Sequence, residues 1–417
     1  MKIKEKDEVY AYIKENMPKT VKESYRELKP VVSPCIKEGF TTFFYWDTYF
    51  ADLALLALGD HKQVENNLDN MRYMVETMGY VPNEYAPDIP IAGMNRSQPP
   101  LFSRSVKDYY MQTKDVRIVQ KYLPALENEY AFWQTQRTSE CGLNRYWHNA
   151  TDEYLRDFCV GICERLRIEP TRYPDLKKQG EHFVSIAESG WDFTPRFFEK
   201  ENAYVGGNYA PVDLNCILYD VERILSEFCA LLGMKEKSDA YAKLAENRKT
   251  LINEYMLGKD GLYYDYDFVT KDRSPVLSAA SCLPFAMGIS EDKAALEKTV
   301  ARLEGEYGLA ACEKLPWECC DQWAYPSVWP PLSYFAYVAL ERLQSERAKP
   351  FAKKYVRTVR ETYEKTGRLW EKYDAEKGGV KKGQEYETVE MLGWTAGVYM
   401  YLSERLRDQD RKAGRSL

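Results

Sequence analysis

The sequence contains few of the residues that usually hold metal ions. Only three histidines occur among its 417 residues, and none lies at ligand spacing from another histidine or from a cysteine. Ten cysteines are scattered along the chain without the C-x-x-C spacing typical of zinc sites. The sequence therefore gives no support to a metal centre.

Long apolar runs and basic clusters are absent as well. No stretch of eighteen apolar residues occurs, so we expect no transmembrane helix. The net charge is -6, and no run of Lys and Arg is longer than a pair such as Lys381–Lys382, so nucleic acid and anionic membranes are not expected as partners. The N-terminal segment MKIKEKDEVYAYIKENM is charged and lacks the apolar core of a signal peptide, which predicts a cytoplasmic protein with reduced thiols. Nothing in the sequence indicates an oligomeric state.

Alternating strand patterns are rare, and 261–268 is the best candidate for a short strand. Apolar residues recur instead at helical spacing, as in Val221, Ile224, Leu225 and Phe228, which precede Gly233 at a C-terminal position. Helices are predicted within 211–233 and at 48–58, 62–78, 101–112, 116–136, 236–256, 291–304, 328–344, 346–366 and 390–407, with Ser290 as the cap of the helix at 291–304. Three longer connections remain at 80–100, 140–175 and 367–389. The pattern predicts an all-α protein of helical hairpins packed side by side, open or closed into a ring.

Aromatic residues are abundant. They make up 14% of the chain and include 33 tyrosines, more than an ordinary core requires, although packing must account for most of them. Five short strings at the edges of predicted helices combine aromatic rings with acids or amides: FFYWDTYF (43–50), NRSQPP (95–100), ESGWDF (188–193), QWAYPSVWPP (322–331) and GQEYETVEMLGWT (383–395). Five of the nine tryptophans lie in four of these strings. We expect the strings to converge on one aromatic and polar pocket suited to a sugar ring.

These strings resemble the trehalase family of inverting glycoside hydrolases. FFYWDTYF and QWAYPSVWPP resemble its two signatures, and RSQPP, ESGWDF, PVDLN, YYDYDF, EKYD and E-Y…GWT follow in the family's order from about Phe40 to about Tyr401. The resemblance implies one domain over 1–417, an (α/α)6 barrel with six inner and six outer helices, and long loops at the active-site end. It also implies a small carbohydrate substrate and no cofactor.

The resemblance assigns roles to individual residues. The general acid falls on Asp192 and the general base on Glu385, with Glu387 and Glu390 as nearby alternatives for the base. An inverting pair stands roughly 6.5–9.5 Å apart, with water between the base and the sugar. Burial beside Trp191 would raise the pKa of Asp192, as a general acid requires. The sugar-binding positions fall on Trp46, Asp47, Asn83, Arg96, Gln98, Asp152, Gly190, Gln322 and Trp323.

Structural roles compete with several of these assignments. Asp192 alone is also a candidate helix cap, Arg96 a loop-anchoring ion pair, and Glu188 a brace for its loop. Asp265 and Asp267 are expected to be solvated or to form a turn.

Several polar residues of the family pattern are missing. The stretch at 38–42 is Glu-Gly-Phe-Thr-Thr where the family has Gly-Gly-Arg-Phe-Arg, and Ala150-Thr151-Asp152 stands for Arg-Pro-Glu. Ala324 replaces an aspartate, and Ser327-Val328 replaces Asn-Gly. The sequence therefore predicts an inverting α-glycosidase more firmly than trehalose as its substrate. Alternatives are a hydrolase of mannosyl- or glucosylglycerate-type compounds or of oligosaccharide ends, a phosphorylase or lyase, and a catalytically silent sugar-binding protein.

Overall fold

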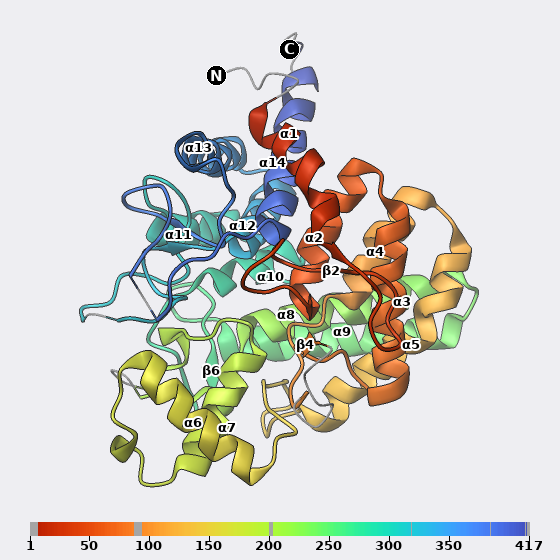
Figure 1. Ribbon diagram of the computed structural model, residues 1–417. Helices are drawn as coiled ribbons and strands as arrows, with labels where there is room; N and C mark the ends of the chain where they lie inside the picture. Colours follow the sequence, from red (N-terminus) through yellow and green to blue (C-terminus); the bar gives the residue numbers. More distant parts are fainter. Residues whose placement is uncertain are drawn as a thin grey trace.

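A computed structural model describes residues 7–86, 94–199, 203–317, 319–383, 385–412 and 414, and its elements form a ring of helices (Figure 1). In this part of the chain the inner helices are α2 (Tyr45–Leu58), α4 (Phe102–Thr113), α8 (Val212–Leu231), α10 (Leu283–Ala286), α12 (Pro330–Arg342) and α14 (Gly393–Lys412). Each contacts the next, and α14 packs on α2, so the ring is closed. The remaining ring helices lie outside: α1 (Glu8–Asn16), α3 (His61–Met78), α5 (Val116–Gln136), α9 (Lys235–Met256), α11 (Lys293–Leu303) and α13 (Ala348–Thr366). The predicted all-α fold with (α/α)6 topology is confirmed.

Burial separates the two layers. The inner helix α8 is buried on nearly every face, whereas its outer partner α9 buries only Ala245, Arg248, Ile252 and Met256. A helix that is apolar all round belongs in a core, and one with a single apolar stripe covers it. The hydrophobic core therefore fills the ring and the space between the two layers.

Polar caps fix where the helices begin. Asp60 accepts a hydrogen bond from the backbone N–H of Gln63 at the start of α3, and Gly59 ends α2 in the left-handed region. At α11 the cap is Asp292, which accepts from the backbone N–H of Ala295, and not Ser290 as predicted. The helix begins two residues later than expected because the carboxylate reaches the free amide at the correct spacing.

The predicted loop at 140–175 contains a helix instead. Helix α6 (Asp152–Leu166) pairs with α7 (Leu176–Glu188), and this hairpin lies beyond the ring, at the lower left of Figure 1. The buried residues of α6 are Leu155, Cys159, Ile162, Cys163 and Leu166, a helical stripe that includes two cysteines. The prediction of a long connection is wrong for this stretch, because Cys159 and Cys163 pack as small hydrophobes and complete the buried stripe.

Short antiparallel strands and 3-10 turns hold the loops together. The strands are β1 (Val21–Lys22), β2 (Val31–Val32), β3 (Phe43–Phe44), β4 (Glu84–Tyr85), β5 (Tyr209–Ala210), β6 (Tyr266–Asp267), β7 (Asp272–Arg273), β8 (Ser327–Val328) and β9 (Tyr373–Asp374), and they pair as β1–β2, β3–β4, β5–β6–β7 and β8–β9. The 3-10 turns are η1 (Met17–Thr20), η3 (Pro170–Arg172), η4 (Pro195–Phe197), η5 (Gly206–Asn208) and η6 (Ala279–Cys282). Of the strand predicted at 261–268, only the two residues of β6 are extended in a sheet. None of the described helices is both long and apolar enough to cross a lipid bilayer.

Candidate active site

The loops that precede the inner helices surround a cavity of about 590 Å³. Strand pairing brings distant loops together here, because β3–β4 joins the segment before Trp46 to the one after Asn83 and β8–β9 joins the segment after Trp323 to the one after Glu371. The lining residues are Gly39, Phe40, Thr41, Thr42, Phe44, Trp46, Asp47, Asn83, Glu84, Arg96, Gln98, Arg165, Gly190, Asp192, Trp323, Trp329, Glu371, Tyr386, Val389, Met391 and Trp394. The size and the mixture of rings with a few charged groups are typical of a small-molecule site.

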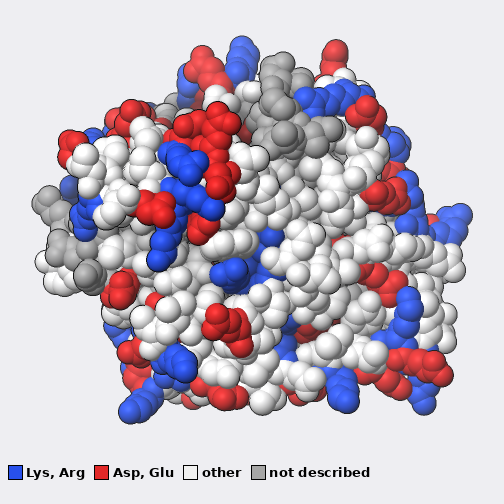
Figure 2. Space-filling model, turned by 90° about the horizontal axis from the view of Figure 1, so that it is seen from below, with Lys and Arg blue, Asp and Glu red and all other residues white. Residues whose placement is uncertain are grey.

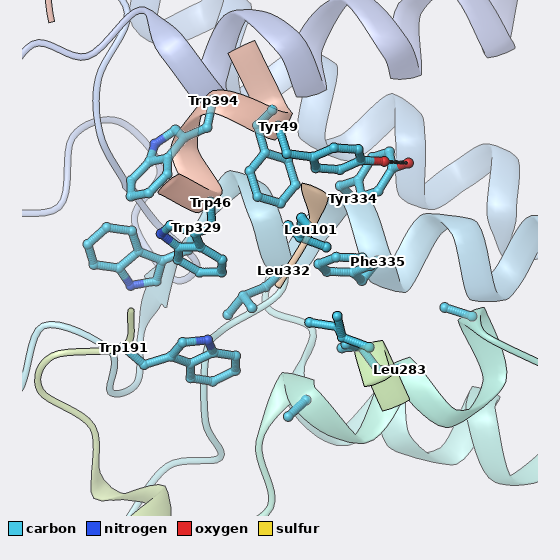
Figure 3. Packing of buried hydrophobic residues seen from close by; sticks show 14 of the residues in the cluster. Trp46, Tyr49, Leu101, Trp191, Leu283, Trp329, Leu332, Tyr334, Phe335 and Trp394 are labelled. Atoms are coloured by element: carbon cyan, nitrogen blue, oxygen red, sulfur yellow. Dashed lines mark hydrogen bonds between the residues drawn. The ribbon is translucent and has the colours of Figure 1, made fainter. Parts of the chain in front are cut away.

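Five tryptophans pack together beside the cavity, and we call Trp46, Trp191, Trp323, Trp329 and Trp394 the tryptophan cluster. Figure 3 shows four of its members gathered in one region, although they come from distant parts of the chain. The rings of Trp323 and Trp329 stack with centroids 3.8 Å apart, and Trp191 stacks on Trp323 at 5.2 Å. All except Trp191 line the cavity. The predicted convergence of the aromatic strings is thus confirmed.

Gly190 lies against this cluster. Its φ is +74°, and a Cβ at this position would stand 2.9 Å from Cε2 of Trp46. Both the backbone conformation and the nearby ring exclude a larger side chain. The glycine lets the loop after α7 run close enough to Trp46 to place the next residues in the cavity.

Asp192 follows in this loop and lines the cavity, with 37% of its side chain exposed. Burial raises the pKa of its carboxyl, and the charges of Arg165 and Arg96 oppose that rise. The alternative role as a helix cap does not hold, because Thr194 provides the capping oxygen for η4. A carboxyl with a raised pKa, open to the cavity, is suited to carry a proton to a bound molecule.

Buried ion pairs brace the loop that carries Asp192. Glu188 pairs with Arg137 at 2.9 Å and accepts from the backbone N–H groups of Ser97 and Trp147 at 2.8 and 2.7 Å, so its role is structural. On the other side of the loop Arg196 lies 4.3 Å from the ring centroid of Trp191.

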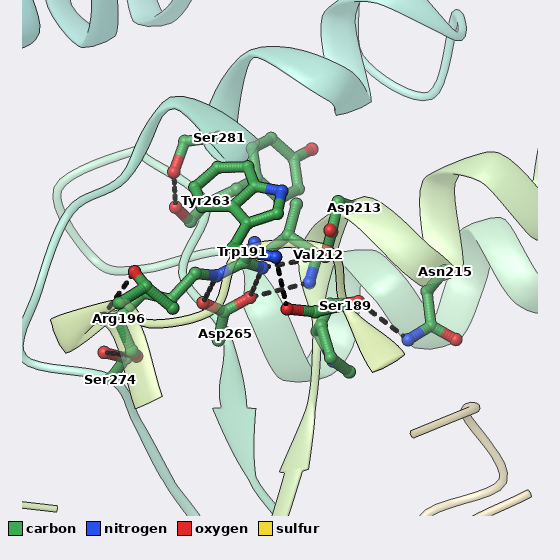
Figure 4. Close-up of polar contacts among 12 residues, drawn as sticks. Ser189, Trp191, Arg196, Val212, Asp213, Asn215, Tyr263, Asp265, Ser274 and Ser281 are labelled. Atoms are coloured by element: carbon green, nitrogen blue, oxygen red, sulfur yellow. Dashed lines mark hydrogen bonds and ion pairs between the residues drawn. The ribbon is translucent and has the colours of Figure 1, made fainter. Parts of the chain in front are cut away.

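Figure 4 shows how Arg196 is held. It pairs with Asp265 at 2.6 Å and with Asp213 at 2.8 Å. Asp265 was expected to be solvated or turn-forming, but it is only 2% exposed because this arginine compensates its charge inside the protein. Asp267 is buried as well, and it forms a turn by accepting from the backbone N–H groups of Val269 and Thr270.

Three further carboxyls line the cavity, those of Asp47, Glu84 and Glu371, and Glu84 accepts a hydrogen bond from the hydroxyl of Thr42 at 2.7 Å. Asp47, in the first turn of α2, is buried, and burial together with the charges of Glu371 and Asp192 raises its pKa to about 8. Glu371 accepts a hydrogen bond from the hydroxyl of Tyr386 at 2.7 Å and one from Nζ of Lys372 at 3.0 Å. Glu371 belongs to the EKYD string, and we overlooked it as a candidate base.

Glu385 occupies a different position from the one we predicted. It is not among the residues that line the cavity, and its side chain is fully buried. One carboxylate oxygen accepts from the backbone N–H groups of Phe193 and Gln322 at 3.0 and 3.2 Å, and the other from Arg165 at 2.8 Å. These contacts fix Glu385 behind Arg165 and leave it no open oxygen toward the cavity.

The other predicted sugar-binding residues divide into two groups. Asn83, Arg96, Gln98 and Trp323 line the cavity together with Trp46, Asp47 and Gly190, and Gln98 also accepts from the backbone N–H of Trp46 at 3.1 Å. Arg96 contacts the hydroxyl of Tyr154 at 3.3 Å, and no ion pair of Arg96 is found in the described part of the chain.

Asp152 and Gln322 do not line the cavity. Asp152 lies in the exposed first turn of α6 and pairs with Lys177 at 3.0 Å. Gln322 is buried and donates to the backbone oxygen of Tyr386 at 3.1 Å. Arg165, near the end of α6, lines the cavity without any motif that marks it, because its helix falls in the segment that we read as a loop.

The distribution of charged side chains on the surface is compatible with a ligand that has no net charge. Figure 2 shows acidic and basic side chains interspersed over one face, with a compact basic group near its centre surrounded by uncharged atoms. Among the residues that the structure describes, no cluster of three or more His, Cys, Asp or Glu side chains is arranged to hold a metal ion.

Comparison with known proteins gives consistent matches. The model of the trehalase family matches residues 2–406. A periplasmic trehalase from Pseudomonas aeruginosa is 30% identical over 408 residues, which cover 91% of this chain and 72% of that protein. A trehalase from Apis mellifera is 30% identical over 411 residues, which cover 91% of this chain and 64% of that protein.

Solved structures show the same fold. The neutral trehalase from Saccharomyces cerevisiae has a TM-score of 0.76 at 20% identity and covers 99% of this chain and 82% of its own. A mannosylglycerate hydrolase from Thermus thermophilus has a TM-score of 0.66 at 14% identity and covers 95% of this chain and 100% of its own. At these identities the likeness concerns the fold alone.

The same comparison contradicts the predicted cytoplasmic location. The relatives from Pseudomonas and Xanthomonas that match most of the chain are named periplasmic trehalases. Our expectation rested on one charged stretch at the N-terminus, and a match along the whole chain outweighs it. The argument for reduced thiols from a cytoplasmic location falls with it, although all ten cysteines are unpaired in the structure.

Proposed function

The chain belongs to the trehalase family and is a glycoside hydrolase, and on this premise we propose that it hydrolyses trehalose with inversion at one anomeric carbon. Relatives of two different kinds, bacterial and insect, are named trehalases and match 91% of the chain. A cavity of about 590 Å³ lined by tryptophan rings and carboxyls supports a substrate of disaccharide size.

The proposed general acid is Asp192 and the proposed general base is Glu371. Asp192 gives its proton to the bridging oxygen while the bond from that oxygen to the anomeric carbon breaks. Glu371 takes a proton from the water that forms the new bond on the opposite face of the sugar, so the products are two glucose molecules. The observation that carries this assignment is that both carboxyls line one cavity while they come from different loops.

Glu371 replaces Glu385 in this proposal for a physical reason. A general base needs an oxygen within reach of the attacking water. Glu371 lines the cavity, whereas Glu385 does not and is held behind Arg165 by that arginine and two backbone amides. We assign Glu385 instead to the support of the acid side of the cavity.

Asp47 and the tryptophan cluster are proposed to bind the glucose unit that is attacked. With a pKa raised to about 8, Asp47 is protonated at neutral pH and donates a hydrogen bond to a sugar hydroxyl. The apolar faces of Trp46 and Trp394 cover the ring, and Gln98 and Asn83 supply further polar contacts at the cavity wall.

A substrate panel with matched variants tests this function. Trehalose, glucosylglycerate and mannosylglycerate are incubated with the wild type and with Asp192→Asn, Glu371→Gln and Glu385→Gln. We expect the wild type to release glucose from trehalose fastest, and the first two variants to lose most activity. Faster release from a glycerate compound would contradict trehalose as the substrate, and no turnover of any compound would favour a sugar-binding protein.

A further inference from the structure

We propose that Arg165 determines specificity for the leaving sugar and positions the acid Asp192. This inference rests on the proposed hydrolysis of trehalose. It assigns a residue of α6 to the site, although none of the sequence motifs includes that residue. The guanidinium lines the cavity, and 37% of its side chain is exposed there.

The first observation is the placement of the guanidinium. Its Nη2 lies 2.8 Å from a carboxylate oxygen of Glu385 and 3.9 Å from an oxygen of Asp192. The rings of Phe193 and Tyr386 flank it, with centroids 5.6 and 5.8 Å from Cζ. The arginine therefore lies beside the acid and between two aromatic rings, close enough to influence the position and charge of Asp192.

The second observation is what holds the arginine. Glu385 is itself fixed by two backbone N–H groups, those of Phe193 and Gln322, so it is a rigid partner for the guanidinium. A buried carboxylate with three donors leaves little freedom in the group that it binds. No partner for Nε or Nη1 of Arg165 is found in the described part of the chain, so these donors remain for a ligand.

The chemistry of the proposed reaction indicates which side of the cavity Arg165 faces. The acid protonates the oxygen of the leaving group, so groups beside Asp192 and away from the base face the leaving sugar. Nη2 of Arg165 lies 3.9 Å from Asp192, and within the described part of the chain Arg165 forms no ion pair with Asp47 or Glu371. We therefore place Arg165 on the leaving-group side of the acid.

The position also accounts for the arginines missing from the family pattern. Thr42 and Ala150 occupy two of those positions. Helix α6 begins directly after Ala150-Thr151 and delivers Arg165 near its other end. A guanidinium with free donors suits the hydroxyl groups of a second sugar, because each unmade hydrogen bond would leave a buried donor unsatisfied.

The test compares two substrates that differ only in the leaving group. Trehalose requires a proton from the acid and contacts for the second sugar, whereas α-glucosyl fluoride releases a small anion that requires neither. Arg165→Gln is expected to lower kcat/KM for trehalose by roughly 10- to 100-fold, the size of one or two lost hydrogen bonds from a charged donor, and to change that for the fluoride by less than about 3-fold. Arg165→Lys keeps the charge with fewer donors and is expected to show a smaller loss in the same direction.

The control variant is Arg156→Gln. Arg156 lies on the same helix and is exposed, and its one hydrogen bond within the described ranges is to the backbone oxygen of Asp152, so its loss of charge is expected to change neither substrate's kcat/KM. An equal loss on both substrates in Arg165→Gln and Arg165→Lys would overturn the inference, because a merely structural role lowers both alike. If Arg165→Gln does not fold, the ratio of kcat/KM for trehalose to kcat/KM for the fluoride in Arg165→Lys decides.

The pH profile gives a second readout. Arg165 lowers the pKa of Asp192, so its neutralisation is expected to move the alkaline limb of kcat/KM for trehalose to higher pH, and Arg165→Lys is expected to leave it in place. An unmoved limb in Arg165→Gln would overturn the positioning role. A wild type that cleaves the fluoride but not trehalose would overturn the proposed function itself, independently of any variant.

Discussion

The two walls of the cavity differ in how they are built. One wall is the tryptophan cluster with Asp47 and Glu371, all in or beside short strings that are conspicuous in the sequence. The other wall is Arg165 on Glu385, which joins a helix outside the ring to a loop more than two hundred residues later. The residues of the first wall belong to local sequence motifs, whereas the second wall depends on a contact between residues that are distant in the sequence.

This difference suggests a division of labour. In the proposed mechanism the ring and its tryptophans hold the glucose unit whose bond is broken. By the further inference, Arg165 of the α6–α7 hairpin contacts the leaving group. Changes in the first wall are expected to affect every substrate, and changes in the second wall only those with a bulky leaving group.

The largest expected effect is on the first wall. Glu371→Gln is expected to lower kcat for trehalose and for α-glucosyl fluoride alike, by roughly 10²–10⁴-fold, because both reactions require an activated water. Glu385→Gln keeps the shape of the side chain that holds Arg165, and it is expected to lower kcat for trehalose more than kcat for the fluoride. Initial-rate measurements on both substrates separate the two, and a Glu371→Gln variant that keeps its activity while Glu385→Gln loses both would reverse the assignment of the base.

The next effect concerns the buried ion pair of Arg137 and Glu188, which braces the loop that carries Asp192. Arg137→Ala leaves Glu188 buried without its partner, so the free energy of unfolding is expected to fall by about 3–5 kcal/mol. Lys237→Ala, which removes an exposed pair with Glu127, is the matched control and is expected to cost less than about 1 kcal/mol. Urea denaturation measures both, and similar losses in the two variants would contradict a structural role for the brace.

A smaller effect is expected where the two walls meet. Gly190→Ala forces a side chain into a left-handed conformation close to Trp46, at a cost of about 1–3 kcal/mol in stability. Because the loop must shift, kcat/KM is expected to fall for both substrates. Thermal unfolding and kinetics check this, whereas an alanine variant with unchanged kinetics would show that the close approach does not position Asp192.

The last prediction concerns the pH dependence of stability. The pKa of Asp47 is raised to about 8 in the folded protein, so the folded state binds a proton that the unfolded state has already lost. Its contribution favours folding at low pH and is lost progressively as pH rises from about 4 to about 8, with a slope of at most about 1.4 kcal/mol per pH unit. Asp47→Asn is expected to flatten this slope in denaturation curves, and an identical slope in the variant would show that Asp47 is ionised throughout.

The sequence predicted the first wall well and the second poorly. Helical periodicity, the aromatic strings and the family resemblance together predicted the ring and eight of the lining residues: Trp46, Asp47, Asn83, Arg96, Gln98, Gly190, Asp192 and Trp323. Trp46 and Asp47 lie in the first turn of α2, and the others lie in the loops between helices.

The failures have physical causes. Glu371 and Glu385 lie in neighbouring strings, and chain position alone cannot tell which carboxylate faces the cavity and which is held by backbone amides. Asp152 was placed by alignment to a segment that here begins an exposed helix. Arg165 was missed because the stripe of α6 includes cysteines, and because its functional contact is with residues far away in the chain.

The most direct test of the central claim is the anomeric form of the first products. Proton NMR at early times, before mutarotation, records the glucose released from trehalose by the wild type. Water attack opposite the leaving group, with Asp192 as acid and Glu371 as base, predicts equal amounts of α- and β-glucose, the β form from the attacked unit. Release of α-glucose alone would contradict inversion and with it the proposed roles of the two carboxyls.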